Sequence, residues 1–268
     1  MSLLATRHLV KSFGDMHAVD GVDFSVEKGE MVALVGSNGA GKTTLVNLIS
    51  GLIRPDAGVI AFRGTDVTAQ TVHERIRAGI ARSFQLVNLF DQLTTLDNVA
   101  LAIFSREGKT RNFAYLADHD RRVRQEAEQI LDQFDLGDKA GVPAGGLAQG
   151  ERKLLDVAVA VALRPTLLFL DEPTSGVSTR EKAPIMDIIT AIVRSENITA
   201  VIIEHDMDVV FKYSDRIVVM HEGRVLAEGT PDAIRANDLV TVTLIGTHAS
   251  VGRASPAPPD QGPSHARA

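Results

Sequence analysis

A glycine-rich stretch of the chain has the residue types and the spacing of a phosphate-binding loop. It reads Gly36-Ser37-Asn38-Gly39-Ala40-Gly41-Lys42-Thr43-Thr44 and is called the phosphate loop below. Its glycines allow successive backbone N–H groups to converge on phosphate oxygens, and Lys42 can reach the terminal phosphates. The hydroxyl group of Thr43 can ligate Mg²⁺. The stretch therefore predicts a site for a nucleoside triphosphate and its metal ion.

The residues on either side of the phosphate loop predict a strand before it and a helix after it. Residues 31–35 are an apolar run of β-forming residues, and Leu45, Leu48 and Ile49 recur at helical spacing until Gly51. A helix that begins at the end of the loop also directs the positive end of its dipole toward bound phosphate. This context disfavours the alternative, a glycine-rich turn that binds no ligand.

Two acidic residues form a second candidate site. Residues 166–170 predict a buried parallel strand, and Asp171 and Glu172 follow it directly. Residues at the carboxyl end of such a strand face the ligand crevice of an α/β sheet. Asp171 would then belong to the Mg²⁺ shell, and Glu172 would polarise the attacking water as a general base. The alternative is a pair of acids at a surface turn.

Composition limits the class of protein. The chain has 268 residues, of which 44% are hydrophobic, enough for one large domain or a domain with a subdomain. A net charge of -6 without a basic run argues against nucleic acid as the main partner. The absence of cysteine excludes disulfides and thiolate sites and fits a reducing cytoplasm. We expect no signal peptide and no membrane span, so attachment to a membrane would need another protein.

Hydrophobic periodicity predicts the remaining elements. Residues 3–35 predict an antiparallel β arm, in which Phe13 is a candidate to stack on an adenine base, although ordinary packing is the alternative. Residues 86–136 predict a helical insertion. The other expected elements are a strand at 59–63, helices at 72–81, 96–104, 123–134, from near 151, and 179–195, a strand at 198–203, a hairpin at 216–220 and 225–227, and a helix from 230.

The order of the motifs along the chain resembles that in the ATP-binding subunits of ABC transporters. The likeness covers residues 3 to about 245 and is carried by the phosphate loop, Gln85, the run Leu147-Ala148-Gln149-Gly150-Glu151, the run Leu170-Asp171-Glu172-Pro173-Thr174 and His205. It implies an α/β fold: a P-loop NTPase core of mixed and parallel sheet, with an antiparallel β arm and an inserted helical subdomain. The implied ABC ATPase domain spans 3–248, with its core at 3–84 and 165–248, the helical subdomain at about 86–164, and a disordered tail at 249–268.

The resemblance implies a role for each motif, with ATP and Mg²⁺ as ligands. Gln85 would reach Mg²⁺ or the attacking water, and His205 would contact the γ-phosphate. The signature run, residues 147–151, would present Ala148, Gln149, Gly150 and Glu151 to ATP bound in an opposite subunit, so that one chain holds half of each site. Here the sequence departs from the Leu-Ser-Gly-Gly-Gln that is usual in the family, and Ser178 stands where an aspartate is common.

Further motifs are similar to one branch of the family, the ATPases of branched-chain amino-acid importers, and most of all to the longer of their two paired ATPase subunits. These motifs are Arg82-Ser83-Phe84-Gln85, Thr95-Leu96-Asp97-Asn98-Val99 and Ile203-Glu204-His205-Asp206-Met207. The implied partners are integral membrane subunits, a second ATPase subunit, identical or paralogous, and indirectly a secreted solute-binding protein. The implied location is the cytoplasmic face of the inner or plasma membrane.

Some alternatives stay open at the level of sequence. Urea, amides or another small organic solute could be the cargo in place of branched-chain amino acids. An ABC-type ATP switch without transport would be expected to show a long coiled-coil insertion or tandem ATPase modules, and the chain has neither. A regulator that binds nucleotide without hydrolysis is disfavoured by the presence of Glu172.

Overall fold

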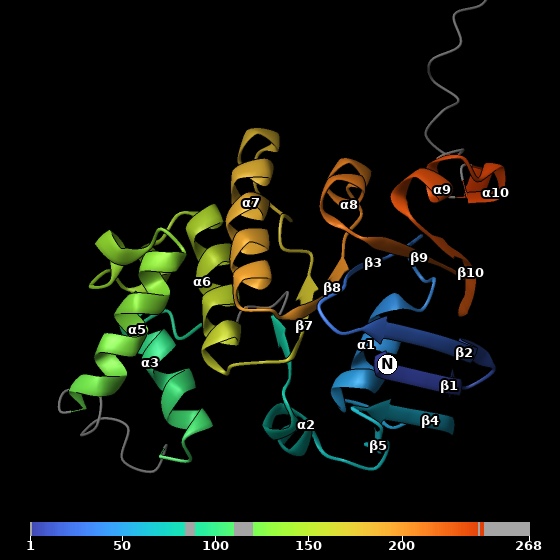
Figure 1. The fold of residues 1–268 in the computed structure, drawn as a ribbon, viewed down its shortest axis with the longest axis horizontal. Coiled ribbons are helices and arrows are strands. Elements are labelled where there is room, and N and C mark those ends of the chain that lie inside the picture. The colour runs from blue at the N-terminus through green and yellow to red at the C-terminus, as the bar shows by residue number, and fades with distance from the viewer. Residues whose placement is uncertain (1, 84–88, 110–119, 241, 244–268) are drawn as a thin grey trace, which may run out of the picture.

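The computed structural model describes residues 2–83, 89–109, 120–240 and 242–243. These residues form two β-sheets and the helices packed against them (Figure 1). Gln85 and the tail predicted at 249–268 lie outside the described residues. No helix in the described ranges has both the length and the apolar character needed to cross a membrane.

A six-stranded sheet forms the centre of the molecule, in the order β10-β9-β3-β8-β7-β6. Neighbouring strands are parallel, except for the antiparallel hairpin of β9 and β10. The strand bounds are β3 (Met31–Gly36), β6 (Ile80–Ser83), β7 (Leu167–Asp171), β8 (Thr199–Ile203), β9 (Arg216–His221) and β10 (Arg224–Gly229). Every residue of β3, β7 and β8 is buried, which explains their uninterrupted apolar runs.

The register of the central strands places three loop segments at one edge of the sheet. Asp171 at the end of β7 pairs with Ile203 at the end of β8, and Leu34 of β3 pairs with Ile203 from the other side. The phosphate loop, the acidic pair and His205 follow these three strand ends. The sheet therefore brings together residues that are far apart in the sequence.

A second, four-stranded sheet has the order β2-β1-β4-β5 and is antiparallel throughout. Its strands are β1 (Ser2–Phe13), β2 (Met16–Glu27), β4 (Ala57–Phe62) and β5 (Thr65–Asp66). It packs in one hydrophobic cluster with α1 (Lys42–Ser50) and one face of the central sheet, including Leu167 and Phe169. The predicted antiparallel arm is thus confirmed.

The opposite face of the central sheet is covered by helices, because successive strand residues point to opposite faces. Leu168 and Leu170 belong to a cluster with α3 (Thr95–Arg106), α5 (Arg121–Gln133), α6 (Gln149–Ala162) and α7 (Thr179–Ser195). A further cluster on Ala33 and Val35 involves α8 (Met207–Tyr213), α9 (Pro231–Arg235) and α10 (Asp238–Val240).

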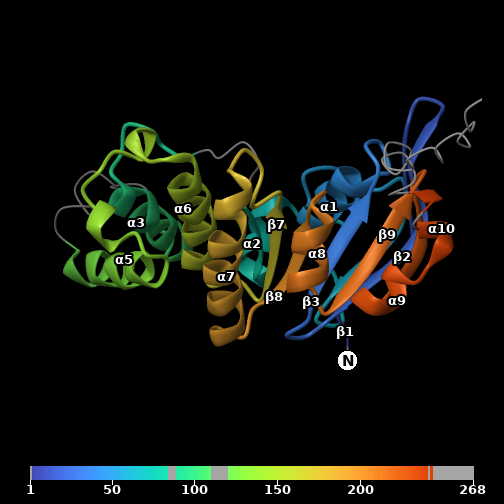
Figure 2. The ribbon, with the colours of Figure 1, turned by 90° about the horizontal axis from the view of Figure 1, so that it is seen from above.

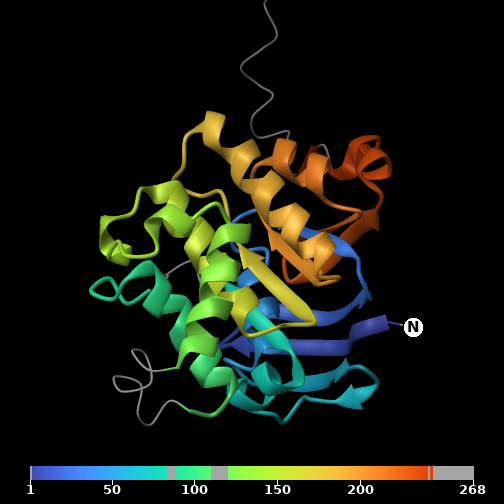
Figure 3. The ribbon, with the colours of Figure 1, turned by 60° about the vertical axis from the view of Figure 1, so that its left-hand side comes forward.

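The helices α3, α5 and α6 lie at one end of the molecule, away from the amino-terminal strands (Figures 2 and 3). They contact one another, and α6 also contacts α7 and the strands β6 and β7. Short 3₁₀ helices at Gly137–Lys139 and Ala144–Gly146 connect α5 to α6. The predicted helical insertion is therefore present, while its limits at 86 and 164 stay a prediction.

One expected helix is shorter than its spacing indicated. The helix predicted at 72–81 is α2 (Val72–Ala78), and residues 80–83 form β6 instead. Gly79 ends the helix because it adopts the left-handed conformation, with a φ of +106°, and its N–H bonds to the Arg75 and Ile76 carbonyls. Ile80 then pairs with Leu167 of β7.

The turn between β9 and β10 lies between the arm and the phosphate loop. The Gly223 N–H donates to the Ala40 carbonyl at 3.1 Å, and the Asp20 N–H donates to the Gly223 carbonyl at 2.9 Å. A Cβ atom on Gly223 would lie 2.8 Å from the His17 carbonyl oxygen. Only glycine therefore fits this contact between the three segments.

Candidate functional site

A hollow of about 250 Å³ lies where the three strand ends meet. Most of the predicted site residues line it. The lining consists of Met16, Ala18, Asn38, Gly39, Ala40, Gly41, Lys42, Thr43, Thr44, Asp171, Glu172, Ile203 and His205. The structure thus brings the phosphate loop, the acidic pair and His205 to one place, as the sequence predicts.

Two glycines of the phosphate loop occupy positions where a side chain would collide with neighbouring backbone. A Cβ atom on Gly36 would lie 2.4 Å from the Met220 carbonyl oxygen, and one on Gly41 would lie 2.3 Å from that of Ala18. Gly41 also has a φ of +98° and precedes the first residue of α1. No side chain of the described residues caps α1, so its first N–H groups are left for an anion.

Lys42 is buried in the phosphate loop. Its Nζ donates to the carbonyl oxygens of Gly36 at 2.7 Å and Ser37 at 3.0 Å. Burial lowers the pKa of Lys42 from its ordinary value, and the nearby carboxylates of Glu172 and Asp171 oppose this effect. The loop therefore holds the ammonium group beside the hollow by carbonyl contacts that a phosphate can replace.

Glu172 and His205 contact each other at the edge of the hollow. His205 Nε2 lies 3.1 Å from Glu172 Oε1. Glu172 has a φ of +49°, and its N–H donates to the Ile203 carbonyl at 2.9 Å. The pair combines a carboxylate that can accept a proton with an imidazole that can orient it.

Asp171 forms a buried ion pair that the sequence does not predict. Its carboxylate bonds to Arg82 of β6, whose other terminal nitrogen donates to Asn47 Oδ1 of α1 at 2.6 Å. The two charged side chains are only 9% and 6% exposed. Arg82 therefore joins three elements, α1, β6 and β7, beneath the phosphate loop.

We expect Arg82→Met to lower the free energy of unfolding by about 3 kcal/mol, because it leaves the buried Asp171 carboxylate without its counter-charge. Urea denaturation followed by circular dichroism measures this loss. The double variant Arg82→Met/Asp171→Asn removes the stranded charge and should recover part of the stability. A single variant as stable as the wild type would contradict the assignment.

His205 is held through its own backbone by a second buried carboxylate. Glu204 Oε2 accepts the His205 N–H at 3.1 Å. Glu204 Oε1 accepts both the N–H of Thr174 at 3.0 Å and its hydroxyl at 2.6 Å. Glu204 thus connects Thr174, in the segment after Glu172, to His205. The sequence alone did not predict this role for Glu204.

Two oxygen donors in the hollow fit a magnesium ion. Thr43 and Asp171 both line it, and hydroxyl and carboxylate oxygens are ligands that Mg²⁺ prefers. Among the described residues no group of three His, Cys, Asp or Glu side chains could hold a metal by itself. The donor set therefore fits an ion that takes further ligands from phosphate oxygens.

The signature run lies outside the hollow, at the amino end of α6. Ala148 is the N-cap residue of α6, and its N–H donates to the Glu151 carboxylate at 2.8 Å. Ala148 has no side chain that could cap the helix, so N–H groups of its first turn remain for another ligand. None of the run's residues appears in the lining of the hollow formed by the described residues.

Three further predicted residues do not line the hollow, namely Gly36 and Ser37 at the start of the phosphate loop, and Phe13. Phe13, at the end of β1, is 50% exposed and its ring lies 5.7 Å from Lys11 Nζ. It does not line the hollow, whereas Met16 and Ala18 of the neighbouring strand do, so its stacking on adenine stays a prediction. The role of Gln85 also stays a prediction, since that residue lies outside the described part of the chain.

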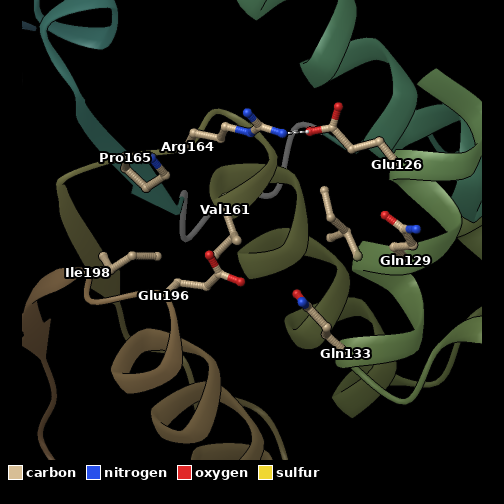
Figure 4. Close-up of a pocket in the computed structure, with 9 residues that line it drawn as sticks. Glu126, Gln129, Gln133, Val161, Arg164, Pro165, Glu196 and Ile198 are labelled. Carbon is tan, nitrogen blue, oxygen red and sulfur yellow. Dashed lines mark hydrogen bonds and ion pairs between the residues drawn. The ribbon is translucent and has the colours of Figure 1, made fainter. Parts of the chain in front are cut away.

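A separate hollow of about 430 Å³ lies between α5, the carboxyl end of α6 and the segment after α7 (Figure 4). Its lining includes the charged residues Glu126, Arg164 and Glu196, of which Glu126 and Arg164 pair with each other at 2.9 Å. It contains none of the predicted site residues and no phosphate-binding loop. The phosphate loop, the acidic pair and His205 thus lie at the smaller hollow and not at this one.

The fold and this site define the class of protein. A sequence model of the family described as "ABC transporter" matches residues 19–175, and the chain belongs to that family. A solved structure of the ADP conformation of an ATP-binding cassette of an ABC transporter superposes with a TM-score of 0.82 at 30% identity, covering 92% of this chain and 99% of that one. The predicted ABC ATPase class and fold are confirmed.

Two relatives indicate to which branch of the family the chain is similar. The chain is 34% identical over 253 residues to the high-affinity branched-chain amino acid transport ATP-binding protein BraF of Pseudomonas aeruginosa, covering 91% of this chain and 98% of BraF. It is also 34% identical over 256 residues to LivG of Escherichia coli, a protein of the same description, with the same coverage. The predicted branch of the family is confirmed.

Proposed function

We propose that this chain is the ATP-binding and ATP-hydrolysing subunit that powers an importer of branched-chain amino acids. The observation that carries the proposal is the gathering of Lys42, Glu172 and His205 around one hollow at the end of the phosphate loop. The described function of BraF and LivG supports the choice of cargo. The chain would act at the cytoplasmic face of the membrane, attached through integral membrane subunits.

The mechanism assigns a distinct task to each residue around the hollow. The loop N–H groups and Lys42 bind the phosphates, with the lysine exchanging its carbonyl contacts for phosphate oxygens. Glu172 accepts a proton from water as the water oxygen attacks the γ-phosphorus, and the bond to ADP breaks. His205, 3.1 Å from Glu172, keeps the carboxylate oriented and can donate to the γ-phosphate.

Thr43, Asp171 and Gln85 are the residues that would hold Mg²⁺. When bound, the ion neutralises the charge that develops on the phosphates. Arg82 meanwhile occupies one side of the Asp171 carboxylate. The side chain of Asp171 is therefore fixed in direction before nucleotide enters.

A second ATPase subunit completes each site in this proposal. The signature run of one chain, with its uncapped helix end, would contact the γ-phosphate held by the phosphate loop of the other. The separation of these two segments within a single chain supports this arrangement. ATP binding would close the pair of subunits and hydrolysis would reopen it, which moves the attached membrane subunits between two states.

An uptake experiment tests the proposal. Cells of the source organism that lack this chain are expected to lose ATP-dependent uptake of radiolabelled leucine, isoleucine and valine, and the wild-type gene should restore it. Labelled urea and a short amide are measured in the same cells. Loss of urea or amide uptake alone would contradict the proposed cargo, and unchanged uptake of every solute would contradict the role in import.

A further inference from the structure

Lys153 is a buried cation for which the proposed chemistry has no use. It lies in α6, shortly after the signature run, and is 6% exposed. Its Nζ donates to the Glu172 carbonyl oxygen at 3.0 Å and to Ser175 Oγ at 2.8 Å. A lysine so deeply buried needs compensating contacts, and both of the contacts found here lie on the segment that carries the proposed general base.

The backbone of Glu172 is in a conformation that requires such support. Its φ of +49° is in the left-handed region, which costs a non-glycine residue energy and persists only where surrounding contacts fix it. Within the described part of the chain, three hydrogen bonds hold the peptide groups of this residue. They are the bond from its N–H to Ile203 at 2.9 Å, the bond from the Ser175 N–H to its carbonyl at 3.1 Å, and the bond from Lys153.

Of these three bonds, only the one from Lys153 comes from the helix that carries the signature run. Ile203 belongs to the central sheet, and Ser175 to the same turn as Glu172. The run itself approaches that turn as well, because a Cβ atom on Gly176 would lie 3.3 Å from Gln149 Nε2. The segment from Glu172 to Gly176 therefore contacts α6 at two places.

We propose that Lys153 is a positioning residue that connects the signature run to the catalytic carboxylate of the same chain. The inference rests on the proposed function, in which the signature run meets ATP held by the opposite subunit. A shift of the amino end of α6 on that contact would be transmitted through Lys153 to the Glu172 carbonyl. The direction of the Glu172 side chain in one site would thus depend on occupancy of the other.

The test compares three variants in the complete transporter, reconstituted in vesicles. Lys153→Met keeps the length of the side chain and removes its charge and hydrogen bonds. Lys153→Arg keeps the positive charge and the ability to donate hydrogen bonds. Lys212→Met is the matched control, since Lys212 also bonds to side chains, Asp187 at 3.2 Å and Tyr213 at 2.7 Å, without contacting the hollow.

We expect the Lys153 variants to change the rate of turnover and to leave ATP binding unchanged. Lys153→Met should lower kcat about tenfold or more, as loss of a charge-assisted hydrogen bond on the catalytic segment implies, with the Kd for ATP within about twofold of wild type. Lys153→Arg should recover most of kcat, and Lys212→Met should match the wild type. A fluorescent ATP analogue gives Kd independently of turnover.

Other outcomes would overturn the inference. A folded Lys153→Met with wild-type kcat contradicts it, as does a parallel loss of kcat and ATP affinity that Lys153→Arg does not repair. Should Lys153→Met fail to fold, Ser175→Ala removes one of the two contacts, and a wild-type kcat there contradicts the inference. If the wild-type transporter hydrolyses no ATP, the proposed function itself is contradicted. If the wild type turns over normally and Lys153→Met has the same kcat, only this inference is contradicted.

Discussion

Replacement of Glu172 by glutamine is expected to reduce ATP hydrolysis by about 10²-fold to 10⁴-fold, the usual contribution of a general base. Glutamine has nearly the same shape but cannot accept a proton from water. ATP binding should stay close to that of the wild type, because Lys42 and the loop N–H groups are unchanged. Hydrolysis would then fail to reopen the subunit pair, and the ATP-bound closed pair should accumulate.

Phosphate release by the reconstituted transporter and size-exclusion chromatography with ATP measure these two effects. Glu222→Gln is a suitable control, because Glu222 also follows a strand and has a positive φ, of 46°, while its side chain is 86% exposed. The control should behave as the wild type. Hydrolysis by Glu172→Gln at the wild-type rate would show that another group takes the proton.

Lys42→Ala is expected to weaken ATP binding by about tenfold to 150-fold and to abolish ATP-dependent uptake. The estimate corresponds to the net value of hydrogen bonds made by a charged group, about 1.5–3 kcal/mol. Lys42 is the buried ammonium group whose Nζ lies among the loop carbonyls at the hollow. Alanine leaves the cradle of N–H groups but removes its positive charge.

Isothermal titration with ATP and uptake by vesicles check this prediction. Lys28→Ala, which removes an exposed lysine from the turn before β3, is the control for loss of charge. Undiminished uptake by Lys42→Ala would be incompatible with ATP as the energy source at this site. Lys42→Ala therefore tests ATP binding, and Glu172→Gln tests hydrolysis.

Much of the fold and site follows from local sequence patterns. The apolar run before Gly36 predicts a strand and the run before Asp171 predicts a buried parallel strand, and the structure confirms both. The phosphate loop and Glu172 were predictable because each directly follows such a strand, whereas His205 was predicted from the resemblance to the ABC family. Parallel strands that end at one edge of a sheet then bring the three together.

Other features depend on contacts between distant segments, which local patterns do not encode. Arg82 pairs with Asp171 only because β6 and β7 are neighbours, and the sequence contains no signal for that adjacency. The contact from Lys153 to Glu172 likewise requires α6 to pack beside β7. The helix α2 ends early because of the left-handed conformation of Gly79, which helical periodicity alone does not predict.

The turn between β9 and β10 has a consequence for the thermodynamics of nucleotide binding. Through Gly223 it bonds to Ala40 in the phosphate loop and to Asp20 in the arm. Fixing a flexible backbone residue costs about 1–2 kcal/mol in conformational entropy, and here that loss occurs during folding rather than during binding. Most of the interaction energy between the loop and the phosphates can therefore appear as affinity.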